Sequence, residues 1–205
     1  EIFWEPVNTE INNQQGFVQA RTFKTHFEVV TFMENKILVN GSYQQIALAN
    51  AVKTESKVEF TYEVEVKAND TATIQKFGGY VVSTNHAKDE LINAAKNVLL
   101  QSNEQGYEQL LINQKLAWAK TWEMSDITID GDVEAQQGIR FNIFQLNQTY
   151  SGKDARLNIG PKGFTGEKYG GSTYWDTEAY CLPFYMATKN QEVARNLLMY
   201  RYNQL

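Results

Sequence analysis

Cysteine, histidine and proline are scarce in this chain of 205 residues, which has one cysteine, two histidines and three prolines. Cys181 can form no disulfide within the chain, and a lone cysteine excludes the zinc motifs that need two or more. His26 and His86 are too few for a histidine-rich zinc site. We therefore expect a fold held together by side-chain packing, with no metal ion.

Long apolar runs and an excess of basic residues are also missing. No run approaches the roughly 20 apolar residues of a transmembrane helix, and the start shows no secretory signal pattern. The chain begins with Glu1 rather than Met, so the missing signal is weak evidence about targeting. A net charge of -5 argues against non-specific nucleic-acid binding, because that activity needs a basic surface to neutralise phosphates.

The first part of the chain is predicted to be β structure. Residues 1–84 are rich in β-branched and aromatic residues, and an Asn40-Gly41 turn follows one apolar run. From 58 to 66, apolar and polar residues alternate strictly, which indicates a half-buried antiparallel strand. A turn at 68–71 predicts that this strand forms a hairpin with the next run, 74–82. We expect residues 1–84 to be part of a β-sandwich.

Residues 85–131 are predicted to form a helical linker. Apolar residues from 91 to 99 recur at helical spacing, with Asn85 as a candidate cap. Gly106 breaks this pattern, and a second helix carries the apolar residues from 110 to 122. We expect these two helices to join the β region to the remainder of the chain.

Further helices are predicted from residue 132 onward. Asp132 caps a helix that runs to 150, with Gly152 just past its end. The next helix starts near Trp175 and is interrupted or bent at Pro183. The last begins near 191 and is still in phase where the sequence stops, without a cap. We therefore expect the chain to be a fragment of a longer protein.

Glycine is concentrated in the stretch from Gly160 to Tyr185, which reads GPKGFTGEKYGGSTYWDTEAYCLPFY. Glycine lets a backbone turn tightly or approach a ligand closely, and a buried loop would leave polar groups unpaired. The stretch is therefore predicted to be a functional surface loop. Lys162 and Lys168 could contact a phosphate there, although lysines in surface loops are more often simply solvated.

Tyr174, Trp175 and Asp176 follow this loop at the first turn of the predicted helix. Aromatic faces cover the C–H surfaces of hexoses, and a carboxylate can accept hydrogen bonds from two neighbouring hydroxyls, so these residue types suit a neutral polyol. On the residues alone, a helix cap for Asp176 and simple packing for Trp175 are the commoner roles. Cys181 is interpreted as a small buried apolar residue.

The segment 132–205 resembles the start of the catalytic domain of glycoside hydrolase family 65. The resemblance rests on the G-x-x-G-x-x-G-E-x-Y loop from Gly160 to Tyr169 and the Trp-Asp-Thr-Glu motif that follows it. The order of β structure and helices is also similar to that family. The resemblance implies part of an N-terminal antiparallel β-sandwich at 1–84, linker helices at 85–131 and the first helices of an (α/α)6 barrel at 132–205.

The resemblance also implies a reaction, closest to that of the family members that act on maltose. It is the inverting phosphorolysis of maltose by inorganic phosphate, giving glucose and β-D-glucose 1-phosphate without a cofactor. Trp175 and Asp176 would hold the non-reducing glucosyl unit, with Tyr174 and Glu178 as supporting residues. The general acid and the phosphate-binding residues are expected downstream of Leu205, so residues 1–205 alone are expected to be inactive. The family further implies a cytoplasmic homodimer that binds neither nucleic acid nor membrane.

Two alternatives stay open. A sibling phosphorylase of trehalose or kojibiose would share the glucosyl subsite, and its acceptor pocket would lie mostly outside this chain. A non-catalytic carbohydrate-binding module with a β-sandwich and helices is the alternative of a different class. Because no catalytic residue is identified within residues 1–205, the sequence does not decide between these alternatives.

Overall fold

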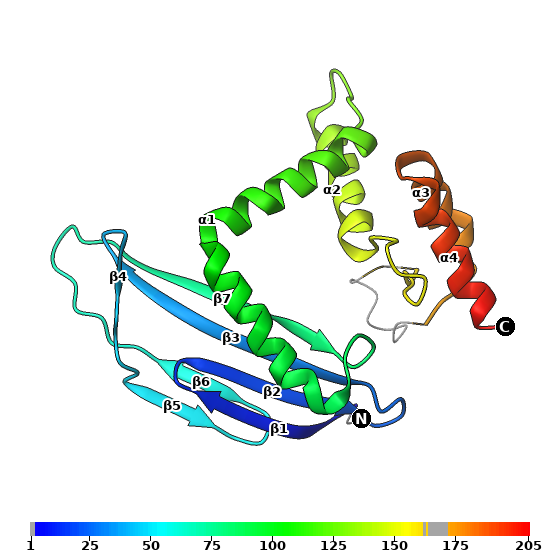
Figure 1. The fold of residues 1–205 in the computed structure, drawn as a ribbon. Helices are drawn as coiled ribbons and strands as arrows, with labels where there is room; N and C mark the ends of the chain where they lie inside the picture. The colour runs from blue at the N-terminus through cyan, green and yellow to red at the C-terminus, as the bar shows by residue number, and fades with distance from the viewer. Residues whose placement is uncertain (1–2, 162, 164–171) are drawn as a thin grey trace. The chain divides into compact units, whose positions relative to one another are not determined.

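The computed structural model describes residues 3–161, 163 and 172–205. The chain divides into two compact units, Glu1–Ile112 and Asn113–Leu205 (Figure 1). Each unit has a hydrophobic cluster of its own, so each has its own basis for stability.

An antiparallel sheet of five strands forms the body of the first unit (Figure 1). The long central strand β3 pairs with β2 and then β4 along one edge, and with β7 along the other. β1 pairs with the outer edge of β2. The strands are β1 (Trp4–Asn12), β2 (Gln15–Thr22), β3 (Glu28–Val39), β4 (Ser42–Gln44) and β7 (Ala72–Val82).

A separate ribbon of two strands, β5 (Asn50–Lys53) and β6 (Val58–Thr61), lies against this sheet. At Gly16 of β2, an added Cβ would come within 2.6 Å of a Val58 methyl, so the absence of a side chain lets β6 approach closely. Thr9 of β1 also donates a hydrogen bond of 2.8 Å to the carbonyl of Glu55, between the two ribbon strands. The predicted antiparallel β class of this region is confirmed.

The predicted hairpin between residues 58–66 and 74–82 is wrong. β6 ends at Thr61 and pairs with β5, whereas β7 pairs with β3. The strict alternation of polar and apolar residues indicated an extended strand, but it carried no information about the partner of that strand.

The pairing of β7 is explained by the turn that precedes it. The Asn40 N–H donates a hydrogen bond of 2.9 Å to the Thr71 carbonyl, and the Asn40 side chain bonds both the Thr71 N–H (3.0 Å) and the Asp70 carboxylate (2.8 Å). The bond from Asn40 also lowers the pKa of Asp70. These bonds tie the turn at Asp70 to the turn at the end of β3, and β7 then runs back along β3.

Two helical segments that meet at Gly106 make up α1 (Leu91–Ser125), which follows a short 3₁₀ turn, η1 (Lys88–Glu90). The backbone leaves the helical conformation at Gly106, with φ of 76° and ψ of 164°, which confirms the predicted break. The predicted cap at Asn85 is wrong, because the first helical turn begins only at Lys88.

A partly buried network of polar groups explains where the helical turn begins. Glu28, the first residue of β3, is only 4% exposed and accepts a hydrogen bond of 2.8 Å from Gln19. The Lys88 ammonium lies 3.4 Å from the same carboxylate and donates a hydrogen bond of 2.8 Å to the His26 carbonyl. A buried carboxylate needs such partners, so the network holds the helix start beside the start of β3.

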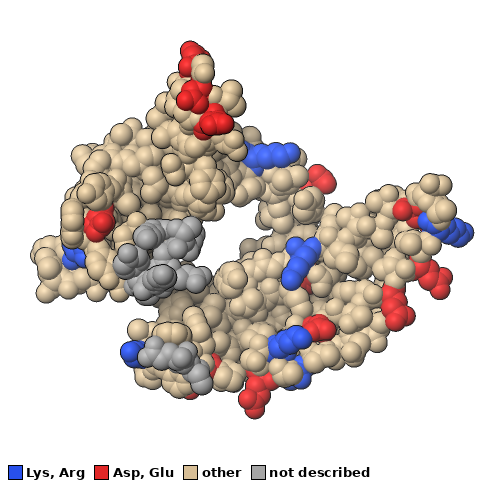
Figure 2. Space-filling model, turned by 180° about the vertical axis from the view of Figure 1, so that it is seen from behind, with Lys and Arg blue, Asp and Glu red and all other residues tan. Residues whose placement is uncertain are grey.

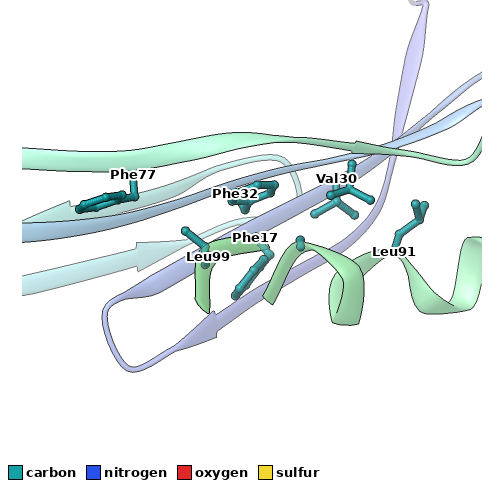
Figure 3. Packing of buried hydrophobic residues seen from close by; sticks show 8 residues of the cluster. Phe17, Val30, Phe32, Phe77, Leu91 and Leu99 are labelled. Atoms are coloured by element: carbon teal, nitrogen blue, oxygen red, sulfur yellow. The ribbon is translucent and has the colours of Figure 1, made fainter. Parts of the chain in front are cut away.

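The first hydrophobic cluster lies between the sheet and the first half of α1 (Figure 3). Its helical members recur every fourth residue and therefore share one face of α1. Its strand members contribute the side chains that point to the helix-covered face of the sheet. Burying each large side chain stabilises the fold by about 1.5–3 kcal/mol. The members are Phe17, Val30, Phe32, Phe77, Val81, Leu91, Ala95 and Leu99.

The second unit is helical after the end of α1. It contains α2 (Val133–Thr149), a π-helical turn η4 (Thr177–Cys181), α3 (Leu182–Thr188) and α4 (Gln191–Asn203). The predicted cap of α2 is confirmed, since the Asp132 carboxylate accepts a hydrogen bond of 2.9 Å from the Ala135 N–H. The predicted interruption near Pro183 is also confirmed. Proline carries no amide hydrogen, and the helix just before it widens into η4, where the Leu182 N–H bonds the Thr177 carbonyl.

The second hydrophobic cluster consists of Tyr150, Ile159, Cys181, Tyr185 and Leu197. The Tyr185 hydroxyl donates a hydrogen bond of 2.9 Å to a carbonyl of α2, and its ring meets that of Tyr150 edge-on at 5.2 Å. This cluster packs α2, α3 and α4 together. The helices confirm the expected mixed class, while the (α/α)6 barrel and the division at 84 and 131 stay predictions.

Replacing Gly152 with alanine should destabilise the second unit. Gly152 follows α2 with φ of 69°, and an added Cβ would collide with Val193 of α4. We expect Gly152→Ala to lower the free energy of unfolding by about 2–4 kcal/mol in chemical denaturation. Gly138→Ala is the matched control, because Gly138 lies within α2 and has open space around it. This control should raise stability by about 0.5–1 kcal/mol, and equal effects of the two changes would contradict the role of Gly152.

Candidate functional site

The candidate site is the segment that follows the glycine-rich loop, from Thr173 to Glu178. Most of that loop, residues 164–171 together with Lys162, lies outside the described residues. Lys162 and Lys168, for which both a phosphate contact and simple solvation were considered, are among these residues. The site is therefore built from Thr173 to Glu178 and from the helices that hold this segment.

Asp176 does not have the capping role that was the commoner expectation. Its backbone is itself helical, with φ of -56° and ψ of -33°, and its side chain accepts no capping hydrogen bond. In the part of the chain that the structure describes, no ion pair or hydrogen bond engages this carboxylate. A partly exposed carboxylate without an internal partner can accept hydrogen bonds from a ligand.

Trp175 is not packed into the helical layer, since it is 69% exposed. Its ring lies 6.0 Å from the ring of Tyr180, which is 68% exposed, at an angle of 45°. Tyr174 beside it is 42% exposed. The turn therefore presents aromatic faces to solvent next to the carboxylate of Asp176, and these faces can cover the C–H surface of a sugar ring.

Thr177 anchors this turn to the interior. It is 1% exposed, and its hydroxyl donates a hydrogen bond of 2.8 Å to the carbonyl of Ile159, a member of the second cluster. The Thr177 N–H bonds the Tyr174 carbonyl at 3.1 Å, and the Ala179 N–H bonds the Trp175 carbonyl at 3.0 Å. The local sequence does not indicate the role of Thr177, because its partner lies on the far side of the loop.

Glu178, predicted as a supporting residue, forms an ion pair with Arg201 of α4. The Arg201 Nε lies 2.9 Å from one carboxylate oxygen of Glu178, and Nη2 lies 3.0 Å from the other. This two-point contact raises the pKa of Arg201. Sequence reasoning missed Arg201, since nothing in the spacing of Glu178 and Arg201 marks them as a pair.

A pocket of about 330 Å³ lies close to this segment, between α2 and residues 159–161 and 163. Its lining includes the side chains of Asn142 and Gln145 from α2, and of Cys181 from η4, but neither Trp175 nor Asp176. Asn142 thus lines this pocket. Arg140, also on α2, pairs with Asp126 at 2.6 Å and lowers the pKa of that carboxyl group.

The charge distribution of the described residues gives no sign of a cation or polyanion site. Among them, no group of three histidine, cysteine, aspartate or glutamate side chains could hold a metal ion. On the face shown in Figure 2, basic and acidic side chains are interspersed, and the described residues form no extended basic area there.

Two family models match the chain. The "Glycosyl hydrolase family 65, N-terminal domain" covers residues 1–121, and the "Glycosyl hydrolase family 65 central catalytic domain" covers residues 140–205. The chain belongs to glycosyl hydrolase family 65. The resemblance carried by the glycine-rich loop and the Trp175-Asp176 motif is thereby confirmed, and the sheet and helices agree with the N-terminal domain of family 65 and the start of its helical domain.

Curated relatives match along nearly the whole chain. Maltose phosphorylase of Bacillus subtilis is 43% identical over all 205 residues, and α,α-trehalose phosphorylase of Thermoanaerobacter brockii is 31% identical over 97% of the chain. The chain spans about a quarter of the length of these relatives, 26% and 25%. A solved structure, "Putative kojibiose phosphorylase from human microbiome", matches 99% of this chain and 26% of its own with a TM-score of 0.85 and 27% identity.

Cys181 should behave as a core residue and not as a nucleophile. It is 8% exposed, and burial, together with the nearby charges of Asp176 and Glu178, raises the pKa of its thiol. Because the thiolate is the reactive form, we expect iodoacetamide to alkylate Cys181 slowly at pH 8 in the native protein and rapidly after denaturation. Mass spectrometry of the peptide that contains Cys181 measures both rates. Equal rates in the two states would contradict the buried position.

Proposed function

We propose that the family 65 protein containing this chain is a disaccharide phosphorylase that acts on maltose. It transfers the glucosyl unit to inorganic phosphate with inversion, giving glucose and β-D-glucose 1-phosphate. The observation that carries the proposal is the 43% identity to maltose phosphorylase of Bacillus subtilis over the whole chain. The exposed Trp175 and the Asp176 carboxylate, which has no internal partner among the described residues, support a sugar-binding role for this segment.

Trp175 and Asp176 bind the non-reducing glucosyl unit in this proposal. The indole face covers the C–H surface of the ring, and the Asp176 carboxylate accepts hydrogen bonds from two neighbouring hydroxyls. A hydrogen bond to a charged group contributes about 1.5–3 kcal/mol, which is sufficient to fix the orientation of a sugar. Tyr174 supports the same subsite from the neighbouring position.

The reaction needs one protein acid and no base to activate water. A phosphate oxygen attacks C1 from the face opposite the glycosidic bond, the C1–O bond breaks, and the acid protonates the departing sugar oxygen. Attack from the opposite face converts the α-linkage into a β-phosphate. Phosphate is already a nucleophile at neutral pH, so a second carboxylate is not required.

Glu178 does not suit the role of this acid, because both of its carboxylate oxygens are already engaged by Arg201. Asp176 is assigned to hydroxyl recognition. We therefore place the general acid and the phosphate-binding residues in parts of the protein outside residues 1–205. The assembly is proposed to be a cytoplasmic homodimer without a cofactor. No described helix of this chain is both long enough and apolar enough to cross a membrane.

Kojibiose phosphorolysis is the second candidate. It is favoured by the structural match over 99% of the chain and by a kojibiose phosphorylase of Caldanaerobacter subterraneus that is 35% identical over 192 residues. A non-catalytic carbohydrate-binding module fits less well, because residues 140–205 match a catalytic domain. Substrate preference is decided by contacts to the departing sugar, so all the phosphorylase candidates share the glucosyl contacts of Trp175 and Asp176.

The proposal is tested by supplying the complete gene product with phosphate and maltose, trehalose, kojibiose or nigerose in turn. We expect maltose to be consumed fastest, only in the presence of phosphate, with ³¹P NMR showing the β-anomer of glucose 1-phosphate. Residues 1–205 alone should release none, because the acid is proposed to lie elsewhere. Faster consumption of another disaccharide would refute the preference for maltose, whereas sugar binding without any cleavage would favour a binding module.

Asp176→Asn should weaken catalysis without weakening the fold. We expect kcat/KM for the disaccharide to fall by about tenfold to hundredfold, the loss of one charged hydrogen-bond acceptor. The melting temperature should stay nearly unchanged, because the carboxylate makes no capping bond. Asp130→Asn, at an exposed position before α2, is the control and should alter neither quantity. A large loss of stability with retained activity would show that Asp176 is structural.

A further inference from the structure

We propose that Arg201 is a positioning residue for the glucosyl-binding pair Trp175 and Asp176. Arg201 lies in the last turn of α4, outside the loop motif. The inference rests on the proposed function, since it concerns how the same sugar subsite is held in shape.

Arg201 makes four hydrogen bonds to three residues of the segment from Thr173 to Glu178. Two go to the Glu178 carboxylate at 2.9 and 3.0 Å. A third joins Nη1 to the Thr173 hydroxyl at 2.9 Å, and a fourth joins Nη2 to the backbone carbonyl of Tyr174 at 3.1 Å. One guanidinium group thus contacts the chain on both sides of Trp175 and Asp176.

The two residues between these contacts have little freedom to move. On the N-terminal side, the Tyr174 carbonyl accepts from both Arg201 and the Thr177 N–H. On the C-terminal side, Glu178 is held by Arg201 and Thr177 by the Ile159 carbonyl. The directions in which Trp175 and Asp176 project are therefore set by fixed points before and after them, which is how a binding site is preorganised.

The helix that carries Arg201 is held in place by buried contacts. α4 is docked through the buried Leu197 and through Asn196, whose side chain donates a hydrogen bond of 2.7 Å to the Gly152 carbonyl. Arg201 is one turn beyond these residues, so the position of its guanidinium is defined by the second cluster. The chain leaving α2 is thereby linked, through α4, to the turn that carries the sugar-binding pair.

Lysine could not replace arginine in this contact. The planar guanidinium offers several N–H donors in a fixed fork, which matches a carboxylate at two points and still leaves donors for a hydroxyl and a carbonyl. A lysine ammonium is a single point charge on a flexible stem and cannot reach the same three residues together. Replacing the guanidinium with a lysine ammonium should therefore weaken the hold on the segment from Thr173 to Glu178, even though the positive charge is kept.

The contact is expected to matter for binding more than for folding. Arg201 and Glu178 have side-chain exposures of 32% and 29%, and ion pairs this accessible contribute little to stability. A small displacement of a positioned group, by contrast, can reduce a rate by roughly a hundredfold. Loss of a positioning residue should thus change KM more than the melting temperature, whereas loss of a merely stabilising residue should do the opposite.

The test uses the complete gene product and the disaccharide that it consumes fastest in the phosphorolysis assay. Arg201→Ala, Arg201→Lys and Glu178→Gln should each raise KM for the disaccharide, the two arginine variants by about tenfold to hundredfold. KM for phosphate should stay unchanged, because phosphate is proposed to bind elsewhere. Arg195→Ala removes the same charge from an exposed position of the same helix and should change neither KM.

A double-mutant cycle with Asp176→Asn gives the second readout. If Arg201 acts by positioning Asp176, Arg201→Ala should have a much smaller effect in the Asp176→Asn background than in the parent protein. Full additivity of the two changes would overturn the inference. So would an Arg201→Lys variant with parental KM, or an Arg201→Ala variant that melts at a lower temperature with KM unchanged. If Arg201→Ala does not fold, Glu178→Gln decides by the same criteria.

The inference and the proposed function fail in different ways. An unaltered KM for the disaccharide in Asp176→Asn itself would refute the sugar-binding role of that carboxylate and, with it, the positioning role of Arg201. A raised KM in Asp176→Asn together with parental values in all three other variants would leave the proposed function intact and overturn only the role of Arg201.

Discussion

Asn196 donates its side-chain hydrogen bond to the Gly152 carbonyl from the buried face of α4, and at the same point the chain passes too close to Val193 for a Cβ to fit. This close approach decides where α4 lies against the end of α2. The contacts of Leu197 and Arg201 depend on it, because both residues are placed by the same helix. The position of α4, and with it the position of Arg201, thus depends on the absence of a side chain at Gly152 and not on a catalytic group.

The features predicted correctly from the sequence were those with local causes. Asp132 as a cap and Gly106 as a break act within one turn of the chain, so their residue types suffice. The partner of the strand after residue 70 was predicted wrongly, because it depends on bonds from Asn40, far away in the sequence. Arg201 was missed for the same reason, because its contact with Glu178 joins residues that are far apart in the sequence and forms only when α4 packs onto the turn. Asp176 looked like a cap by residue type, and its helical backbone angles and the missing capping hydrogen bond excluded that role.

Membership of family 65 is decided within this chain, whereas the choice of substrate is part of the proposed function. The domain matches and the glycine-rich motif establish the family within this chain. Relatives whose names specify maltose, trehalose, kojibiose and nigerose all share this region. Under the proposed function, one glucosyl-binding turn serves each of these activities, and the choice among them is proposed to depend on the pocket for the departing sugar.

The π-helical turn η4 also affects the direction in which the residues just before it, Trp175 and Asp176, project. An α-helix turns by about 100° per residue, so a wider turn that contains one additional residue rotates everything before it by about that angle. Tyr185 and the rest of α3 can therefore keep the packing that the second cluster requires, while Trp175 and Asp176 face a direction that a regular helix would not give them. One additional residue in an otherwise ordinary helix thus changes which side chains reach solvent, while the packing of the second cluster is kept.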